Sequence, residues 1–505
     1  MNISRWISHW ANWAPDRTAL RFEGRSITYA ELERRVAGLA GFLAKLGLTP
    51  GDRVAYLGPN CPELLETLFA AARIGAIFVP LNARMPPPEL RVFVEQSEPR
   101  ILVAEESFRD AAARSAPELT PNDVVFFDAN GLEPHVRDET PVAADPELDG
   151  ATPVLIAYTS GTSGAPKGAV LTHEALTTNA LNAIAAFEMT ADDEILTAAP
   201  MFHVGGLNIH TTPALRAGAT VTIHRQFDPG LALEEIRRVR ATFLVAVPTM
   251  SLAMAAHPSW AATEIGSLRC VATGSTLVPD AAIRPWLDRG VPVVQVYGLT
   301  ETCPIATIVP LHESHRKAST AGKAVIHCRV GVVDASGREL SPLEVGEVVI
   351  RGSNVMQGYW RNPEATRQAF RDGWFRSGDA GFLDEDGYLH IVERMKDVIG
   401  VGSSDVYPTD LEQILAESPD VAEAAVVGRA DPALGEVPVA CVVAAPGRSP
   451  TPQEVIALFE ARLAAYKHPR DVVFLDRLPR TSLGKVQKEA LRVLVSDSGS
   501  AATAR

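Results

Sequence analysis

Apolar residues recur along the first part of the chain at two alternating spacings. Leucine and valine follow a helical period over residues 32–43, and the short apolar run at 53–57 predicts a buried strand. A second helix over 63–74 leads into another apolar run at 76–81. Strand, helix and strand at this spacing predict βαβ units and mostly parallel sheets.

This alternation of predicted strands and helices continues to about residue 247, and a different pattern of residues follows. Short strands with glycine-rich turns are expected over 329–359, and a smaller unit follows Lys396. In the first stretch the pattern predicts helices over 174–187 and 231–239 and strands over 219–224 and 243–247. In the last it predicts strands at 424–427, 437–444 and 472–475 and a helix over 452–465.

The predicted fold class is α/β. We expect a large N-terminal body of βαβ-built sheets with a short β-rich subdomain over 1–395, carrying the ATP and acyl pockets. A small, mobile C-terminal α+β domain follows over 396–495. The tail over 496–505 consists of small and polar residues and is expected to be disordered.

Composition narrows the class of protein. The chain has 505 residues, 46% of them hydrophobic and 21% charged, which allows a large core. A net charge of -14 argues against general nucleic-acid binding, which needs a basic face. The 5 cysteines are scattered without a CxxC pair, which predicts a reducing compartment and no structural zinc. No signal peptide or membrane span is expected, so the cytoplasm is the predicted location.

One segment has the composition of a phosphate-binding loop. Tyr158-Thr-Ser-Gly-Thr-Ser-Gly-Ala-Pro-Lys-Gly168 lies between two apolar, strand-like runs. Glycines let backbone N–H groups point at an anion, hydroxyls add donors and Lys167 adds charge. It is not a Walker A loop, because Gly168 follows the lysine. A flexible linker is the alternative. The candidate residues are Thr159, Ser160, Gly161, Thr162, Ser163, Gly164 and Lys167.

This loop resembles the signature loop of the AMP-forming acyl-CoA synthetases and the related adenylation domains and luciferases. The resemblance extends from near residue 10 to about residue 492, and eight motifs in register make it specific. Seven further segments match in the expected order: Pro200-Met-Phe-His-Val-Gly-Gly-Leu207, Tyr297-Gly-Leu-Thr-Glu301, Gly346-Glu-Val-Val-Ile-Arg-Gly352, Gly358-Tyr-Trp360, Trp374-Phe-Arg-Ser-Gly-Asp379, Arg394-Met-Lys-Asp397 and Pro479-Arg-Thr-Ser-Leu-Gly-Lys485.

The resemblance implies a nucleotide and metal site at the end of one strand. Tyr297 would stack on adenine, Thr300 would contact the phosphate of the acyl-adenylate, and Glu301 would hold Mg²⁺ together with Thr162. These residues follow an apolar run, and ligands gather at the carboxyl ends of strands in α/β sheets. A carboxylate with phosphate oxygens suits magnesium. The alternative is a strand cap with an exposed glutamate.

The resemblance also implies roles for charged residues nearer the C-terminus. Asp379 would bind the ribose hydroxyls and Arg394 would make a second nucleotide contact, with a plain salt bridge as the alternative. Lys485 matches the catalytic lysine, whose ammonium offsets charge while pyrophosphate leaves. Lys396 matches the hinge about which the C-terminal domain rotates, removing Lys485 and admitting the thiol.

The expected acyl pocket is apolar, with Glu301 as its only charge. The segments expected to line the pocket contain no arginine to pair a second carboxylate, and the sequence leaves the positions of Arg225 and Arg240 open. This favours a fatty-acid-like aliphatic or alicyclic monocarboxylic acid and leaves aromatic acids open. By resemblance, His203 would be the gate between the pocket and the thiol tunnel, with a core histidine as the alternative. The candidate lining residues are His203, Val204, Gly205, Met250, Thr273, Gly274, Ser275 and Leu299.

Two segments depart from the family pattern. Residues 272–276 stand where many relatives have Ser-Gly-Gly-Ala-Pro, which would narrow the pocket or add a hydroxyl contact. Gly402-Ser403-Ser404-Asp405 replaces a Gly-Gly-Glu-Asn-like loop that lines the thiol tunnel in relatives. A tunnel that tolerates Ser403 is the favoured interpretation, and an altered thioester step is the alternative.

Together these features predict an ATP-dependent acid–thiol ligase. With ATP and Mg²⁺ it would activate a carboxylic acid as acyl-AMP, and coenzyme A would then accept the acyl group. One alternative is a stand-alone adenylating enzyme that loads a carrier-protein phosphopantetheine. Another is a catalytically inactive nucleotide-binding sensor. A homodimer is left open.

Overall fold

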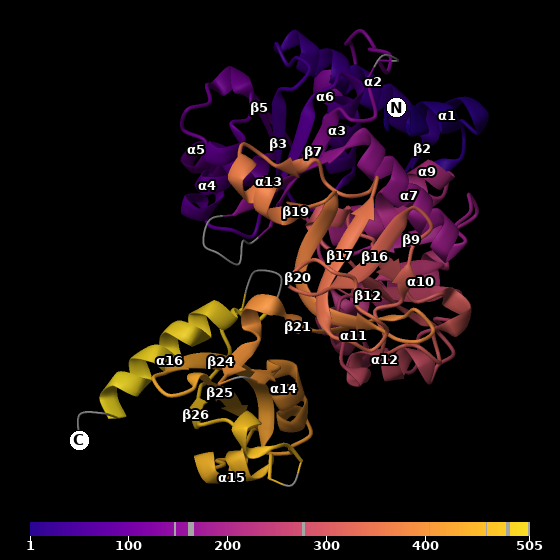
Figure 1. Cartoon of the computed structure of the whole chain (residues 1–505). Coiled ribbons are helices and arrows are strands. Elements are labelled where there is room, and N and C mark those ends of the chain that lie inside the picture. The colour runs from indigo at the N-terminus through magenta and orange to yellow at the C-terminus, as the bar shows by residue number, and fades with distance from the viewer. Residues whose placement is uncertain are drawn as a thin grey trace. The chain divides into compact units, whose positions relative to one another are not determined.

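The chain divides into two compact units. The first unit contains Met1–Val330 and Val349–Arg376, and the second contains Gly331–Val348 and Ser377–Arg505. Figure 1 labels the elements of each. The computed structural model describes residues 1–145, 148–159, 166–274, 278–402, 404–460, 462–480 and 485–502, with the backbone alone over 497–502.

The first unit contains a seven-stranded sheet in the order β18-β8-β7-β4-β3-β5-β6. Its five strands β3 to β7 run parallel, while β8 is antiparallel to both β7 and β18. The expected βαβ units are therefore confirmed. The strands are β3 (Arg53–Gly58), β4 (Ile77–Asn82), β5 (Ile101–Glu105), β6 (Val124–Phe127), β7 (Pro153–Thr159), β8 (Lys167–Thr172) and β18 (Gly358–Tyr359), with helices α3 (Pro62–Arg73), α4 (Pro87–Ser97), α5 (Arg109–Ser115) and α6 (Glu133–Val136).

A nine-stranded sheet in the order β15-β14-β13-β12-β11-β9-β10-β1-β2 completes the core of the first unit. Its central strands are parallel, and the antiparallel strands lie at the two edges. The strands are β1 (Thr18–Phe22), β2 (Arg25–Thr28), β9 (Glu194–Thr197), β10 (Thr220–Ile223), β11 (Phe243–Val245), β12 (Cys270–Gly274), β13 (Val293–Tyr297), β14 (Thr307–Ile308) and β15 (Lys323–Ala324).

The helices that flank this sheet begin at residues suited to capping. Thr28 and Thr172 each accept a hydrogen bond from a backbone N–H of the first turn, at the starts of α2 and α7. The helices are α1 (Arg5–Trp13), α2 (Tyr29–Lys45), α7 (His173–Phe187), α8 (Val204–Gly206), α9 (Thr212–Ala217), α10 (Pro229–Val239), α11 (Pro248–Ala255) and α12 (Asp280–Leu287). None of the described helices is long and apolar enough to cross a membrane.

Short strands occupy the region where the sequence predicts them. They are β16 (Cys328–Val333), β17 (Gly346–Gly352), β19 (Phe370–Arg371), β20 (Trp374–Leu383) and β21 (Leu389–Arg394), with α13 (Pro363–Ala369) among them. Asp379 lies in the middle of β20, which continues to pair with β21 beyond a bulge at 380–381.

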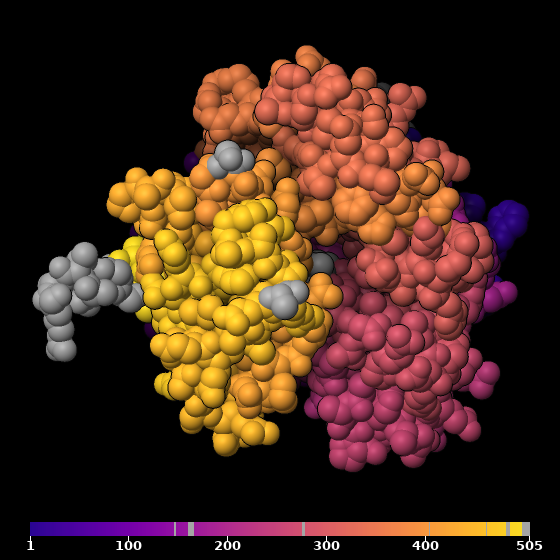
Figure 2. Space-filling model, turned by 60° about the horizontal axis from the view of Figure 1, so that its bottom comes forward, coloured from indigo at the N-terminus to yellow at the C-terminus, as the bar shows by residue number. Residues whose placement is uncertain are grey.

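The second unit has a sheet with helices on both faces. Its hairpin β24–β25 is antiparallel, and β26 lies parallel to β25. One apolar cluster joins the sheet to α14 and α15, and a second joins its other face to Leu491 and Val495 of α16. The elements are β22 (Ile399–Val401), β23 (Ser404–Val406), α14 (Pro408–Ala416), β24 (Val421–Asp431), β25 (Gly435–Ala444), α15 (Pro452–Ala457), β26 (Asp471–Phe474) and α16 (Lys488–Ala502). Figure 2 shows one face of this unit, with its residues coloured from orange to yellow toward the C-terminus.

Two expectations for the second unit differ from the structure. The helix predicted over 452–465 ends at Ala457, because the next residues form tight i→i+3 turns that turn Phe459 into the core. Within the tail predicted to be disordered over 496–505, residues 496–502 continue helix α16, and residues 503–505 lie outside the described residues. A helix anchored by Leu491 and Val495 extends readily, since each added residue gains one backbone hydrogen bond.

Candidate active site

Four neighbouring parallel strands of the nine-stranded sheet end at one edge and lead into most of the predicted site residues. In the order of the sheet they are β13, β12, β11 and β9. Ligand sites in such sheets form beyond the carboxyl ends of the strands. The residues that follow or end these strands are Tyr297, Leu299, Thr300 and Glu301 after β13, Thr273 and Gly274 in β12, Met250 after β11, and His203, Val204 and Gly205 after β9. Ser275 lies outside the described residues.

His203 caps the short helix α8. Its Nδ1 accepts a hydrogen bond of 3.0 Å from the N–H of Gly205, which fixes the ring against its own turn. Gly206 cannot carry a side chain, because a Cβ there would lie 2.2 Å from the carbonyl oxygen of Pro200. A π-helix over Leu207–Thr211 follows, a rare conformation that is enriched at functional sites.

The segment that leads into His203 is held by a residue that the sequence analysis did not single out. The Nδ2 of Asn60 donates to the carbonyl of Ala199 at 2.9 Å, and its Oδ1 accepts from the N–H of Met201 at 2.8 Å. Asn60 is 5% exposed. Since 141 residues separate Asn60 from Met201, no local pattern in the sequence could have revealed this contact.

The turn after β13 buries two of the predicted residues. Thr300 and Glu301 are 9% and 7% exposed and form a short 3₁₀ turn. Gly298 is required there, because a Cβ at this position would lie 1.6 Å from the carbonyl oxygen of Pro304. The Glu301 carboxylate forms no ion pair with any residue that the structure describes, although it is largely removed from water.

Residues 354–360 bind this turn at four points. Asn354 donates from Nδ2 to the carbonyl oxygens of Thr302 and Ile305, each at 2.9 Å. The N–H of Met356 donates to the Glu301 carbonyl at 2.7 Å. The Tyr359 hydroxyl donates to Oε1 of Glu301 at 2.7 Å. Both the backbone and the side chain of Glu301 are therefore held by the 354–360 segment.

The same segment holds the second strand of the predicted phosphate-loop hairpin. β18 pairs with β8, and the N–H groups of Gln357 and Trp360 donate to carbonyls of β8 at 2.9 and 2.7 Å. The ammonium of Lys167 lies 5.3 Å from the centre of the Tyr359 ring. At the base of the hairpin the Thr159 hydroxyl donates to the Lys167 carbonyl at 3.3 Å. Ser160, Gly161, Thr162, Ser163 and Gly164 lie outside the described residues.

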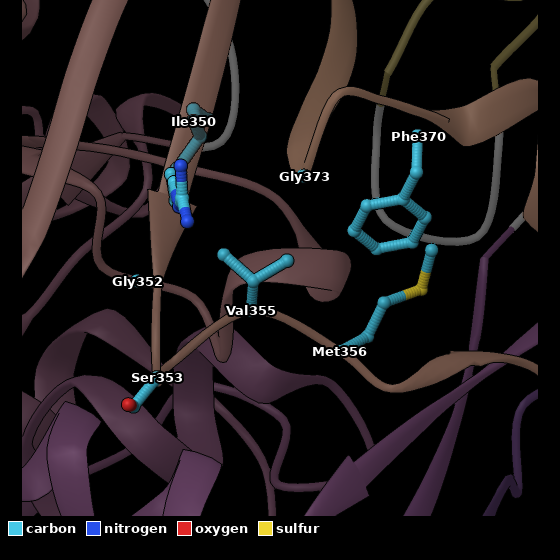
Figure 3. Close-up of a pocket in the computed structure, with 8 residues that line it drawn as sticks. Ile350, Gly352, Ser353, Val355, Met356, Phe370 and Gly373 are labelled. Atoms are coloured by element: carbon cyan, nitrogen blue, oxygen red, sulfur yellow. The ribbon is translucent and has the colours of Figure 1, made fainter.

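A hollow of about 370 Å³ opens beside the 354–360 segment (Figure 3). The side chains of Val355, Met356 and Phe370 line it, and Arg351 is the one charged residue among the described residues of its lining. None of the predicted nucleotide or acyl residues that the structure describes lines this hollow. Its full lining is Ile350, Arg351, Gly352, Ser353, Val355, Met356, Phe370 and Gly373.

In the second unit, the two residues predicted to contact the nucleotide contact each other. Asp379 of β20 stands opposite Arg394 of β21, and Nε of Arg394 lies 2.8 Å from Oδ1 of Asp379. The Asp379 side chain is 5% exposed, and the Arg394 side chain is 41% exposed. The salt bridge considered from the sequence as an alternative is thus present.

The predicted hinge is tied to helix α16. Arg492 donates to the Lys396 carbonyl at 3.2 Å and forms a short ion pair with Asp397. Burial lowers the pKa of the Lys396 ammonium, and Asp397 opposes that effect. Near the start of the same helix, Lys488 lies 2.9 Å from Glu412 and 3.4 Å from Glu393. Burial alone would lower the pKa of Lys488, but these two carboxylates raise it above its usual value.

The predicted catalytic lysine lies three residues before this helix. Lys485 is partly buried and adjoins Val486, which bridges to Arg480. The predicted hinge contacts helix α16, and the predicted catalytic lysine precedes that helix in the same unit. Ser403 lies outside the described residues. Among the described residues no group of three or more histidine, cysteine, aspartate and glutamate side chains could hold a metal ion.

Comparison with known proteins gives matches along the whole chain. The family model "AMP-binding enzyme" matches residues 7–360, and "AMP-binding enzyme C-terminal domain" matches residues 410–485. An indoleacetate–CoA ligase of Aromatoleum aromaticum is 46% identical over 98% of each chain. A feruloyl-CoA synthase of an Amycolatopsis species is 42% identical over 97% of this chain and 98% of its own. The crystal structure of ATP-bound MatB from Rhodopseudomonas palustris superposes with a TM-score of 0.90 at 32% identity, over 99% of this chain and 100% of its own.

Proposed function

This chain belongs to the AMP-binding enzyme family as an ATP-dependent acid–CoA ligase, and we propose that it activates an aromatic carboxylic acid as acyl-AMP before transfer to coenzyme A. The observation that carries the choice of acid is the full-length similarity to two ligases whose names specify indoleacetate and ferulate. A fatty-acid-like aliphatic acid, favoured by the apolar segments in the sequence, is the competing class.

The first half-reaction joins the acid to AMP. A carboxylate oxygen attacks the α-phosphorus of ATP, and the bond from that phosphorus to the bridging oxygen breaks to release pyrophosphate. Lys485 and Lys167 offset the developing negative charge, and Thr300 contacts the phosphate of the product. Tyr297 holds the adenine, and Asp379 with Arg394 holds the ribose. Thr159 and the 160–164 loop surround the phosphates.

Glu301 fits the role of a magnesium ligand. The residue is 7% exposed, and its carboxylate has no cationic partner among the described residues and keeps one oxygen bound by Tyr359. Magnesium usually takes one or two carboxylates and completes its shell with phosphates and water. When bound, the ion would neutralise phosphate charge. Thr162 is the second proposed ligand.

The second half-reaction transfers the acyl group. The coenzyme A sulfur attacks the acyl carbon, the bond from that carbon to the phosphate oxygen breaks, and AMP leaves while the thiol proton passes to solvent. We propose that His203 gates the thiol and that rotation about Lys396 removes Lys485 between the two steps. The remaining pocket residues are Val204, Gly205, Met250, Thr273, Gly274, Ser275 and Leu299. The domain limits at 395 and 495, a cytoplasmic location and a homodimer stay predictions.

Acid-dependent exchange of labelled pyrophosphate into ATP, measured without coenzyme A, tests the first step. Exchange that needs both Mg²⁺ and an aromatic acid would support the proposal. Exchange with acyl-AMP accumulation but no acyl-CoA on adding coenzyme A would favour a carrier-protein acceptor. ATP binding without exchange for any acid would favour a nucleotide sensor.

A further inference from the structure

We propose that Tyr359 is a positioning residue for adenylation: it holds the Glu301 carboxylate for the metal–nucleotide and separates it from the Lys167 ammonium. This inference rests on the proposed function, in which the Glu301 carboxylate binds the metal ion and the Lys167 ammonium binds phosphate. Nothing in the sequence motif Gly358-Tyr-Trp360 assigns such a role. It follows from two contacts that the two ends of one side chain make.

The hydroxyl end of Tyr359 binds the carboxylate. It donates to Oε1 of Glu301 at 2.7 Å. The Glu301 carboxylate has no charged partner among the described residues. A buried carboxylate normally acquires a cationic partner, because an unpaired charge is costly away from water. A neutral donor keeps the carboxylate in place and leaves its full charge available to an incoming cation.

The ring face of Tyr359 lies under the lysine. The Lys167 ammonium is 5.3 Å from the ring centre, within the range of a cation–π interaction. Lys167 and Glu301 form no ion pair with each other, although one aromatic side chain contacts both. A direct pair would have to be broken before phosphate could bind the lysine and a cation could bind the glutamate. Tyr359 therefore keeps the two opposite charges near each other and unpaired.

The backbone around Tyr359 fixes where its side chain begins. Its N–H donates to the Thr366 hydroxyl at 2.9 Å, and that hydroxyl donates to the Asn362 carbonyl at 2.8 Å. Asn362 also caps α13 by accepting from the N–H of Ala365 at 2.9 Å. With β18 paired to β8, the residue is held from two sides. The contact with Glu301 is thus a consequence of rigid elements, which favours a precise catalytic geometry.

The variant Tyr359→Phe removes the hydroxyl and keeps the ring. We expect the Mg²⁺ concentration for half-maximal pyrophosphate exchange to rise about tenfold, the scale expected when a charged group loses one hydrogen bond. The maximal rate at saturating Mg²⁺ should change much less. Tyr29→Phe is the matched control, because that buried hydroxyl donates to the Ala219 carbonyl at 2.8 Å, away from the site. An unchanged Mg²⁺ requirement in Tyr359→Phe would overturn the proposal.

The variant Tyr359→Leu removes the ring as well, so that Lys167 and Glu301 can pair. We expect it to raise the KM for ATP together with the Mg²⁺ requirement, whereas Tyr359→Phe should raise only the latter. Identical ATP dependence in the two variants would contradict the separating role. Both are assayed at a temperature where circular dichroism reports a native fold. If the unaltered enzyme shows no exchange, the proposed function fails, and calorimetric ATP binding with and without Mg²⁺ still tests Tyr359.

Discussion

The guanidinium of Arg394 and the carboxylate of Asp379 form a salt bridge of 2.8 Å across two adjacent strands. Asp379 is almost fully buried, whereas Arg394 keeps 41% of its side chain exposed. In the proposed site, an incoming ribose would meet a carboxylate that is already paired with a partly exposed arginine. The pair is a preformed half of the proposed nucleotide site.

Removing the two partners should have unequal effects on stability. Arg394→Met leaves a buried carboxylate without its arginine, which we expect to lower the free energy of unfolding by about 1–3 kcal/mol. Asp379→Asn leaves a half-exposed arginine, which water can solvate, and should cost less than about 1 kcal/mol. Urea denaturation of both variants measures the difference. The opposite order would show that Asp379 does not depend on Arg394.

The same substitutions separate stability from nucleotide binding. Asp379→Asn should raise the KM for ATP by about tenfold, because a ribose hydroxyl then loses a charged acceptor. Because Asp379→Asn should lower stability only slightly, a rise in its KM for ATP would report on nucleotide binding and not on unfolding. An unchanged KM for ATP would remove Asp379 from the proposed nucleotide site.

Lys485→Ala should affect the two half-reactions unequally. Acid-dependent pyrophosphate exchange should fall by about a hundredfold or more, since the ammonium stabilises charge only while pyrophosphate leaves. Formation of acyl-CoA from a supplied acyl-adenylate should be close to that of the unaltered enzyme. Lys488→Ala is a poor control, because Lys488 is partly buried between Glu412 and Glu393, so Lys467→Ala is used, whose single acidic partner Asp410 lies 3.8 Å away. Equal loss of both half-reactions would refute the assignment.

Asn354 should contribute to stability out of proportion to its size. It is fully buried, and Asn354→Leu would leave the carbonyls of Thr302 and Ile305 without their donor. We expect a loss of roughly 2–5 kcal/mol in the free energy of unfolding. Asn12→Leu is the control, because it removes one exposed hydrogen bond to Ser8. A loss in Asn354→Leu no larger than in the control would contradict this account.

His210 should make the protein less stable in acid. Its ring lies between Phe187 and Phe243, with ring centres 4.4 and 5.3 Å away, and neither nitrogen hydrogen-bonds to a described residue. Burial lowers the pKa of His210 to about 3. Because the folded-state pKa lies below the unfolded value, the unfolded chain takes up a proton that the folded chain does not as the pH falls from about 6.5 toward 3. Stability is lost across that window.

The variant His210→Leu removes this titration. As the pH falls from 6.5 to 5, the free energy of unfolding of the unaltered protein should decrease by about 2 kcal/mol more than that of the variant. The linkage relation requires this, because only the unaltered protein has His210 to protonate on unfolding. The depressed pKa of about 4 at His173 is common to both proteins, so it cancels in the difference. Chemical denaturation at several pH values measures the gap. A gap that does not change with pH would contradict the prediction.

The sequence predicts helices and strands that depend on the pattern of neighbouring residues. The two strands that flank residues 160–165 and the strand that ends at Tyr297 follow from short apolar runs, and the structure has all three. The α/β class with a smaller C-terminal part is confirmed in the same way. These elements form because neighbouring residues share a face, which a periodic pattern reveals.

Contacts between distant segments were not predictable in the same way. Tyr359 meets Glu301 across 58 residues of chain, through a two-residue strand too short to leave a periodic pattern. The Asn60 contact with Met201 spans 141 residues. Position along the chain carries no information on such polar contacts, because each depends on how the sheets are assembled. The motif indicates that residues 358–360 matter, but only the folded structure brings Tyr359 to the Glu301 carboxylate.

The most direct test of the account is to incubate the purified enzyme with Mg-ATP, coenzyme A and a panel of acids, and to measure AMP and acyl-CoA by mass spectrometry. The panel pairs indoleacetate and ferulate with short and long aliphatic acids. We predict equal amounts of AMP and acyl-CoA with an aromatic acid, and much less product with the aliphatic ones. Product from aliphatic acids alone would replace the proposed substrate class. Absence of both AMP and acyl-CoA across the panel, with ATP still bound, would contradict the account.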